Sequence, residues 1–182
     1  MVTLTSHSPA ETWALGEAWG RVATPGWVIG LTGDLGAGKT QLVKGIAAGL
    51  GSGARVHSPT FSLVNEYSGG RCRLFHLDLY RLETMDQIRS AGLEEYLFSP
   101  AGVTVIEWFD RWGAGELTAA TPAAMGEAAG ESLLPGADRA GEPATLAAGG
   151  APPRQAHPGL RRVWLEVLSP TDRRIRYEDT GT

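Results

Sequence analysis

The chain has 182 residues, a formal net charge of −4 and an isoelectric point near 5.6, so one domain with one core is expected. The acidic balance argues against a dedicated nucleic-acid-binding surface, although it leaves a local basic patch open. The single cysteine, Cys72, excludes an internal disulfide and a cysteine metal cluster, and it favours a reducing, cytoplasmic compartment. No stretch approaches the ~18 apolar residues of a membrane helix, and no secretory signal is visible.

The first predicted element is a helix over residues 9–22. Ser8 is suited to cap it, Pro9 fits the first helical position, and Glu11 completes a capping box. We expect this helix to cover one side of a sheet. Its predicted buried face consists of Trp13, Ala14, Ala18, Trp19 and Val22.

The next unit is an apolar strand over residues 27–32, a glycine-rich loop and a helix over residues 40–50. Residues 33–40 read Gly-Asp-Leu-Gly-Ala-Gly-Lys-Thr, a complete G-x-x-x-x-G-K-[ST] in the strand–loop–helix context that this motif requires. Glycines let backbone N–H groups surround a phosphate, and the helix N-terminus adds its dipole. Lys39 can reach the β and γ phosphates, and the Thr40 hydroxyl can ligate Mg²⁺. The pattern predicts a nucleoside-triphosphate site formed by Asp34, Leu35, Gly36, Ala37, Gly38, Lys39 and Thr40.

A loop with two hydroxyl groups, Ser58-Pro59-Thr60, precedes a strand predicted over residues 61–67. In many phosphate-binding switches a loop hydroxyl at this point completes the Mg²⁺ coordination or senses the γ phosphate. A proline-containing turn without such a role fits the same residues equally well.

A second strand is predicted over residues 73–81, after a hairpin turn at residues 68–70. Its alternation sets His76, Asp78 and Tyr80 on one face of an otherwise apolar strand. Polar groups on a buried face are costly unless that face lines a polar site or solvent. The alternation therefore favours a functional face, with ordinary surface residues as the alternative.

Residues 83–97 have a helical pattern, divided into two short helices at residues 91 and 92, and a strand follows over residues 102–108. This strand ends in a carboxylate, Glu107. Ligands gather at the carboxyl ends of strands in an open parallel sheet, so Glu107 is expected near Lys39 and Thr40, facing the metal. The alternative is an exposed glutamate at a strand end.

Residues 113–160 differ in composition, because Ala, Gly, Pro, Glu and Thr dominate there. Such a stretch cannot bury enough apolar surface to offset its ordering entropy, so we predict a flexible insertion. The expected organisation is a core over residues 1–112, this insertion, and a C-terminal β-hairpin over residues 161–182 that completes the same domain. The predicted fold is a three-layer α/β fold of the P-loop NTPase type, with a central, mostly parallel sheet.

Several classes of phosphate-loop protein do not fit. A GTPase needs an N-K-x-D-type guanine reader, and neither lysine is followed by x-Asp. The chain is too short for the second domain of a large ring ATPase, and Ser68-Gly69-Gly70 lies in a turn rather than opening a helix as a transporter signature does. A small-molecule phosphotransferase remains an alternative, although no arginine-rich lid pattern is present. A third hypothesis is a nucleotide-dependent binding module without useful hydrolysis.

Five motifs in order and at close spacing resemble the TsaE family, the ATPase component of bacterial tRNA threonylcarbamoyladenosine (t6A) biosynthesis. They are the glycine loop at 33–40, Ser-Pro-Thr-Phe at 58–61, Asn-Glu-Tyr at 65–67, His-Leu-Asp-Leu-Tyr-Arg at 76–81 and Ile-Glu-Trp at 106–108. The likeness covers residues 12–112, with a weaker likeness in the C-terminal hairpin. The low-complexity stretch at residues 113–160 departs from the family pattern.

The resemblance implies a small ATPase that binds ATP and Mg²⁺ and hydrolyses slowly alone. It implies protein partners, the carbamoyltransferase-like TsaD and its inactive paralogue TsaB, which together modify the adenosine beside the anticodon. Hydrolysis would reset that complex between turnovers. Contact with tRNA would be indirect, through the complex, and no membrane is involved.

The resemblance also implies roles for single residues. Lys39, Thr60 and Asp78 would be catalytic, with Asp78 polarising the attacking water or contacting the metal's ligands. Thr40 and Glu107 would hold the metal. Trp108 would lie beside the nucleotide. The roles of His76, Tyr80 and Arg81, in the site or at the partner interface, stay open.

Overall fold

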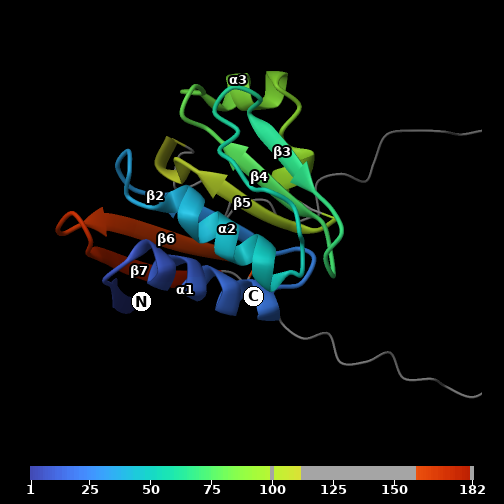
Figure 1. The fold of residues 1–182 in the computed structure, drawn as a ribbon. Coiled ribbons are helices and arrows are strands. Elements are labelled where there is room, and N and C mark those ends of the chain that lie inside the picture. The colour runs from blue at the N-terminus through green and yellow to red at the C-terminus, as the bar shows by residue number, and fades with distance from the viewer. Residues whose placement is uncertain (99–100, 112–158, 181–182) are drawn as a thin grey trace, which may run out of the picture. The chain divides into compact units, whose positions relative to one another are not determined.

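A mixed β-sheet is the framework of the computed structural model, which describes residues 1–98, 101–111 and 159–180. Its strands lie in the order β1-β7-β6-β2-β5-β4-β3 (Figure 1). The strands are β1 (Val2–Ser6), β2 (Val28–Thr32), β3 (Val64–Tyr67), β4 (Leu74–Asp78), β5 (Val103–Glu107), β6 (Leu160–Val167) and β7 (Arg173–Thr180). The helices are α1 (Pro9–Val22), α2 (Lys39–Gly49), α3 (Met85–Ser90), α4 (Glu95–Phe98) and the 3₁₀ turn η1 (Phe109–Arg111). The insertion predicted over residues 113–160 lies outside the described residues, except for 159 and 160.

The central strands of the sheet run parallel. Strand β2 pairs with β5 on one side and β6 on the other, and β4 pairs with β5. Strands β7, β1 and β3 join antiparallel toward the edges. The predicted α/β fold with a mostly parallel centre and a C-terminal hairpin is therefore confirmed. No helix within the described ranges is both long and apolar enough to cross a membrane.

Strand β1 is absent from the sequence-based prediction. Val2 and Leu4 alternate with Thr3 and Thr5, but the alternation is short and four of the five side chains are exposed. It forms because its backbone pairs with β7, from Val2 opposite Tyr177 to Ser6 opposite Arg173. A pairing between such distant segments cannot be read from a local pattern.

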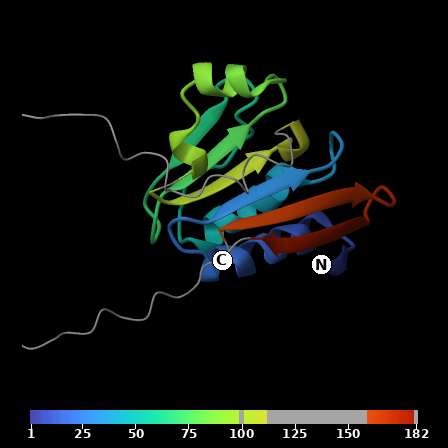
Figure 2. The same ribbon diagram turned by 180° about the vertical axis from the view of Figure 1, so that it is seen from behind.

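Each face of the sheet carries an apolar core. Helices α1 and α2 lie side by side over one face (Figure 1), and the view from behind has the strands in front of them (Figure 2). Ile29 and Leu31 of β2 belong to the core under these helices. Val28 of the same strand joins a second core with Ile88 of α3 and Phe109 of η1. This alternation produces the three layers.

Helix α1 begins where the sequence predicts, but its cap differs in one bond. Ser8 accepts a hydrogen bond from the Glu11 N–H at 3.2 Å, as an N-cap does. The Glu11 carboxylate accepts from the N–H of His7 at 2.8 Å, one residue earlier than a capping box requires.

Of the predicted buried face of α1, Trp19 is confirmed as buried, but the rest is wrong because glycines rather than apolar side chains form the contact with α2. Gly16 and Gly20 pack against Gly45 and Gly49, and a Cβ added at Gly45 would lie 2.0 Å from the carbonyl oxygen of Trp13. The two backbones are therefore in direct contact. The buried residues of α1 are Thr12, Gly16, Trp19 and Gly20, whereas Ala14, Ala18 and Val22 are exposed.

Two strands are shorter than predicted. Strand β3 begins at Val64, because Leu63 adopts a φ of +65° and the preceding Phe61 is 86% exposed in a turn. Strand β4 ends at Asp78, so Tyr80, 49% exposed, does not share a strand face with His76. The predicted division of residues 83–97 into two short helices is confirmed by α3 and α4.

Replacing Gly45 by alanine is expected to destabilise the protein. Helix propensity alone would favour alanine by roughly 0.5–1 kcal/mol, so the sign of the effect tests the close crossing. The added Cβ meets a backbone oxygen, and overpacking of this kind costs about 1–3 kcal/mol. We expect urea denaturation, followed by circular dichroism, to show a lower free energy of unfolding. Gly53→Ala is the matched control, since a Cβ there meets no atom within 4 Å. Equal stability of Gly45→Ala and wild type would contradict the crossing.

Candidate functional site

The glycine loop at residues 33–40, called the phosphate loop after its predicted role, connects the carboxyl end of β2 to the first turn of α2. Gly36 and Gly38 have φ values of +77° and +103°, which glycine adopts without strain. The Lys39 ammonium folds back over the loop and donates to the carbonyl oxygens of Gly33 at 2.6 Å and Asp34 at 2.9 Å. The backbone carbonyls of the loop thus surround the ammonium group of its own lysine, Lys39.

The Lys39 ammonium lies among groups of opposite effect. Burial lowers the pKa of Lys39, while the carboxylates of Glu107 and Asp78 act to raise it. Its Nζ also lies 3.9 Å from the centroid of the Trp108 ring. Trp108 follows β5 with a φ of +60°, an unusual conformation for a non-glycine residue. This turn sets the indole ring against the ammonium.

Glu107, at the carboxyl end of β5, joins the loop to the sheet. The register of the parallel strands sets it opposite Leu31 of β2 and Asp78 of β4. The Thr40 hydroxyl donates to Glu107 Oε1 at 2.7 Å, and His76 Nε2 lies 2.9 Å from the same oxygen. Both His76 and Glu107 are buried. The carboxylate is therefore held from a helix and from a neighbouring strand.

Asp78, the second buried acid, holds the loop that precedes β3. Its Oδ2 accepts hydrogen bonds from Thr60 Oγ1 at 2.6 Å and Ser58 Oγ at 3.0 Å. Its Oδ1 accepts from the Tyr80 N–H at 2.9 Å. The two loop hydroxyls are thus engaged by a carboxylate that lies beside Glu107.

A hollow of about 250 Å³ lies between the phosphate loop, the start of α1 and the turn after β6. Arg173 bridges one wall to the loop, because its guanidinium donates to the carbonyl oxygens of Gly36 at 3.3 Å and Ser169 at 2.8 Å. The hollow is lined by Pro9, Thr12, Gly36, Gly38, Gln41, Pro170, Thr171 and Arg173.

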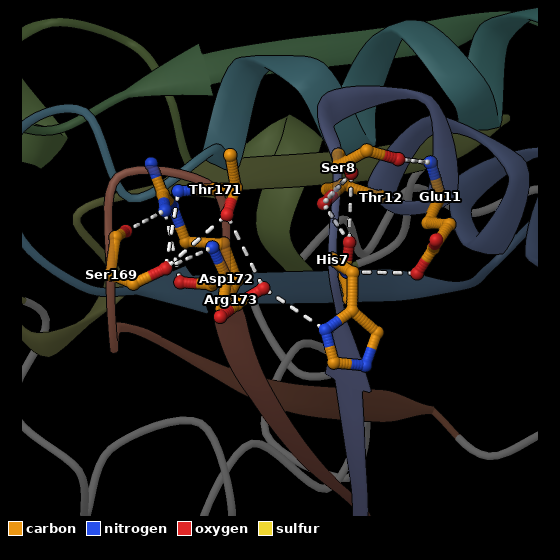
Figure 3. A network of polar contacts seen from close by, with 9 residues as sticks. His7, Ser8, Glu11, Thr12, Ser169, Thr171, Asp172 and Arg173 are labelled. Atoms are coloured by element: carbon orange, nitrogen blue, oxygen red, sulfur yellow. Dashed lines mark hydrogen bonds and ion pairs between the residues drawn. The ribbon is translucent and has the colours of Figure 1, made fainter.

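A polar network joins two walls of this hollow (Figure 3). His7, just before α1, lies 2.9 Å from Asp172 in the β6–β7 turn. This hydrogen bond is the main reason why the pKa of Asp172 is lowered. On the turn side, the N–H of Asp172 donates to Ser169 Oγ at 2.9 Å, which fixes the shape of the turn.

The donor chemistry beside the loop fits a hard divalent cation. A hydroxyl and a carboxylate oxygen meet at Thr40 and Glu107, and Mg²⁺ prefers oxygen ligands. Within the described ranges no group of three or more His, Cys, Asp and Glu side chains is arranged to hold a metal. A cation at this point would take its other ligands from phosphate and water, as Mg²⁺ usually does.

The residues singled out from the sequence converge on this edge of the sheet. Thr40 contacts Glu107, Thr60 contacts Asp78, and Trp108 contacts Lys39. Leu35 differs, since its side chain is 88% exposed and only its backbone belongs to the loop.

Sequence reasoning missed two contacts of the site. The bond from Arg173 to the phosphate loop has no local signal, because it depends on the turn between β6 and β7. The bond between His76 and Glu107 has a partial signal, the alternation of polar residues along β4.

Comparisons with known proteins identify the family of this chain. The family model of the threonylcarbamoyl adenosine biosynthesis protein TsaE matches residues 6–128. The chain belongs to the TsaE family. It is 46% identical over 101 residues to the tRNA threonylcarbamoyladenosine biosynthesis protein TsaE of Bacillus subtilis (strain 168), and the match covers 56% of this chain and 62% of that protein. It is 48% identical over 104 residues to the protein of the same name from Nostoc sp. (strain PCC 7120), covering 56% and 64%.

A solved structure shares its fold with this chain. The crystal structure of Bacillus subtilis YdiB superposes with a TM-score of 0.61 at 25% identity, covering 99% of this chain and 86% of that one. The sequence matches span less than two thirds of the length of the two TsaE relatives named above.

Proposed function

We propose that this chain binds ATP with Mg²⁺ and hydrolyses it slowly, as the ATPase subunit of tRNA t6A modification acting on a TsaD–TsaB partner complex. Family membership supports the pathway, because the relatives are named for t6A biosynthesis. The partners modify tRNA, so the contact of this chain with tRNA is indirect. We assign the activity to the cytoplasm.

One observation carries the ATPase proposal: the Thr40 hydroxyl bonds to the Glu107 carboxylate at 2.7 Å, directly after the lysine of a glycine-rich loop. This combination joins a phosphate-binding loop, a hydroxyl and a strand-end acid at one edge of a parallel sheet. The same three groups recur in P-loop NTPases, where they bind the phosphates and their metal.

Each residue of the site has a proposed step. Lys39 exchanges its bonds to the carbonyls of Gly33 and Asp34 for bonds to phosphate oxygens, helped by its desolvated position. Thr40 and Glu107 would hold Mg²⁺, which would neutralise charge on the β and γ phosphates. Thr60 leaves Asp78, and Asp78 Oδ2 then accepts a hydrogen bond from the attacking water.

Phosphate release by the full chain with Mg²⁺ and ATP tests this function. We expect slow release alone and a clear increase with the partner complex. Lys39→Ala is expected to lose about 100-fold or more in turnover, as when one preorganised charge is removed from a phosphate or oxyanion site. Asp78→Ala is expected to stay folded and bind ATP while losing partner-stimulated turnover.

Three outcomes would count against this proposal. Equal phosphate release by Lys39→Ala and wild type would show that ATP is not hydrolysed at the phosphate loop. Fast ATP hydrolysis in the absence of partners would contradict the proposed dependence of the rate on the partner complex. ATP consumption coupled to phosphorylation of a metabolite would favour the phosphotransferase alternative.

We propose further that the hollow beside the phosphate loop takes the base and ribose. Ligands gather beyond the carboxyl ends of parallel strands, and the hollow lies between the phosphate loop and the turn that follows β6. Its volume of about 250 Å³ is below the roughly 300–1,000 Å³ of sites that enclose a whole ligand. This size suits the base and ribose, with the phosphates held by the loop outside the hollow.

Filling the hollow tests this placement of the base. Thr171→Trp is expected to weaken ATP binding at least tenfold, because the indole takes the space of the base, and to leave inorganic tripolyphosphate binding unchanged. Thr171→Val, which keeps the size and loses the hydroxyl, is the matched control. Titration calorimetry of both ligands measures the two affinities. An equal loss for ATP and tripolyphosphate would mean that the loop, not the hollow, was disturbed.

Exposed aromatic and arginine side chains beside the site support a partner surface, which we define as Phe61, Tyr80 and Arg81. The Arg81 guanidinium lies 5.0 Å from the Phe61 ring centroid, and the Tyr80 and Trp108 ring centroids are 5.0 Å apart. Aromatic and arginine side chains dominate the energy of many protein interfaces. This surface is connected to the phosphate loop, because Tyr80 packs against Trp108 and Trp108 contacts Lys39. A partner that binds here can therefore affect the position of Lys39.

Phe61→Ser tests this partner surface. Loss of an aromatic anchor is expected to lower the ratio of stimulated to unstimulated hydrolysis at least tenfold at a limiting partner concentration. Val22→Ser is the control, because Val22 is 64% exposed at the end of α1 far from the phosphate loop. An unchanged ratio for Phe61→Ser, measured as a partner titration of phosphate release, would exclude this surface.

A further inference from the structure

His76 is the most deeply buried histidine among the described residues, with no exposed surface, and its Nε2 lies 2.9 Å from Glu107 Oε1. The other ring nitrogen, Nδ1, is buried and has no hydrogen-bond partner within the described ranges. A buried polar atom without a partner lowers stability, so an apolar side chain would suit the core better. The burial of His76 therefore calls for a reason beyond packing.

The contact with Glu107 supplies such a reason. Within the described part of the chain, the hydrogen bonds to this carboxylate come from Thr40 and His76, and both reach Oε1. An ionised carboxylate only accepts, so His76 donates through Nε2–H. Two donors on one oxygen restrict the rotation of the side chain and leave Oε2 available. Thr40 donates with its proton and keeps lone pairs for a cation.

We infer that His76 is a positioning residue that holds the Glu107 carboxylate in the orientation needed to bind Mg²⁺. This inference rests on the proposed Mg²⁺-nucleotide site. The role of His76 is distinct from that of Asp78, whose oxygens bond to the Ser58–Thr60 loop and to the Tyr80 N–H. It also separates His76 from Tyr80 and Arg81, which lie on the surface. Side chains that orient a metal ligand typically change metal affinity 10–100-fold when they are removed.

A Mg²⁺ titration of nucleotide binding tests the inference without using turnover. The affinity of the full chain for a non-hydrolysable ATP analogue is measured in EDTA and over a series of Mg²⁺ concentrations. His76→Leu is expected to raise the Mg²⁺ midpoint at least tenfold and to leave the affinity in EDTA unchanged. His76→Gln, whose amide N–H₂ can reach the position of Nε2, is expected to restore most of the wild-type midpoint.

Thr104→Val is the matched control for a purely structural role. Its hydroxyl is also buried in the sheet, on β5, and donates to the Tyr96 carbonyl at 2.6 Å, away from the site. The variant is expected to unfold at a lower temperature than wild type and to keep its Mg²⁺ midpoint. If His76→Leu does not fold, His76→Asn takes its place. The asparagine amide is too short to reach Glu107, so the same rise in the Mg²⁺ midpoint is expected.

The outcomes separate this inference from the function on which it rests. Wild type without Mg²⁺-dependent nucleotide binding overturns the proposed function and the inference with it. Mg²⁺-dependent binding with the same midpoint in wild type and the variant that lacks the donor overturns the role of His76 alone. An equal shift in the Gln variant and the donor-free variant also overturns it, because the hydrogen bond would then make no difference.

Discussion

The hydrogen bond from the Thr40 hydroxyl to the Glu107 carboxylate is the contact on which the site depends. Its donor begins helix α2 and its acceptor ends strand β5, so the bond fixes the phosphate loop against the sheet. The two residues meet because β2 and β5 are parallel neighbours whose carboxyl ends share one edge. A buried carboxylate is stable only when it is hydrogen-bonded, so fold stability and site geometry rely on the same atoms.

The scaffold around this contact is set by close backbone packing rather than by large side chains. The glycine crossing between α1 and α2 brings the start of α1 next to the phosphate loop, where Pro9 and Thr12 line the hollow. The turn between β6 and β7 closes the opposite wall, and Asp172 of this turn bonds to His7 in the segment before α1 (Figure 3). Segments from the two ends of the described chain therefore complete one side of the site.

The two buried acids of the site have different neighbours and hence different proposed tasks. Glu107 is bonded to a helix hydroxyl and an imidazole, which suits a fixed metal-binding group. Asp78 is bonded to hydroxyls of a surface loop that contains the exposed Phe61, which suits a group that changes partner. In the proposed partner-dependent ATPase, Glu107 would belong to a fixed metal site and Asp78 to a loop contact that changes during turnover.

The sequence by itself determined the parts that depend on short-range chemistry. The phosphate loop follows from glycine spacing and a strand–helix context, Glu107 from its place at a strand end, and the TsaE family from five ordered motifs. Tertiary structure alone decided strand β1, the glycine face of α1 and the partner of His76. These depend on segments that meet across the fold. The spacing of the glycines in α1 and α2 and the polar alternation along β4 are visible in the chain, but such a local pattern does not identify the segment that it meets. The apolar pattern at Phe61 and Leu63 misled for the converse reason, since a positive φ and an exposed turn overrode a strand-like composition.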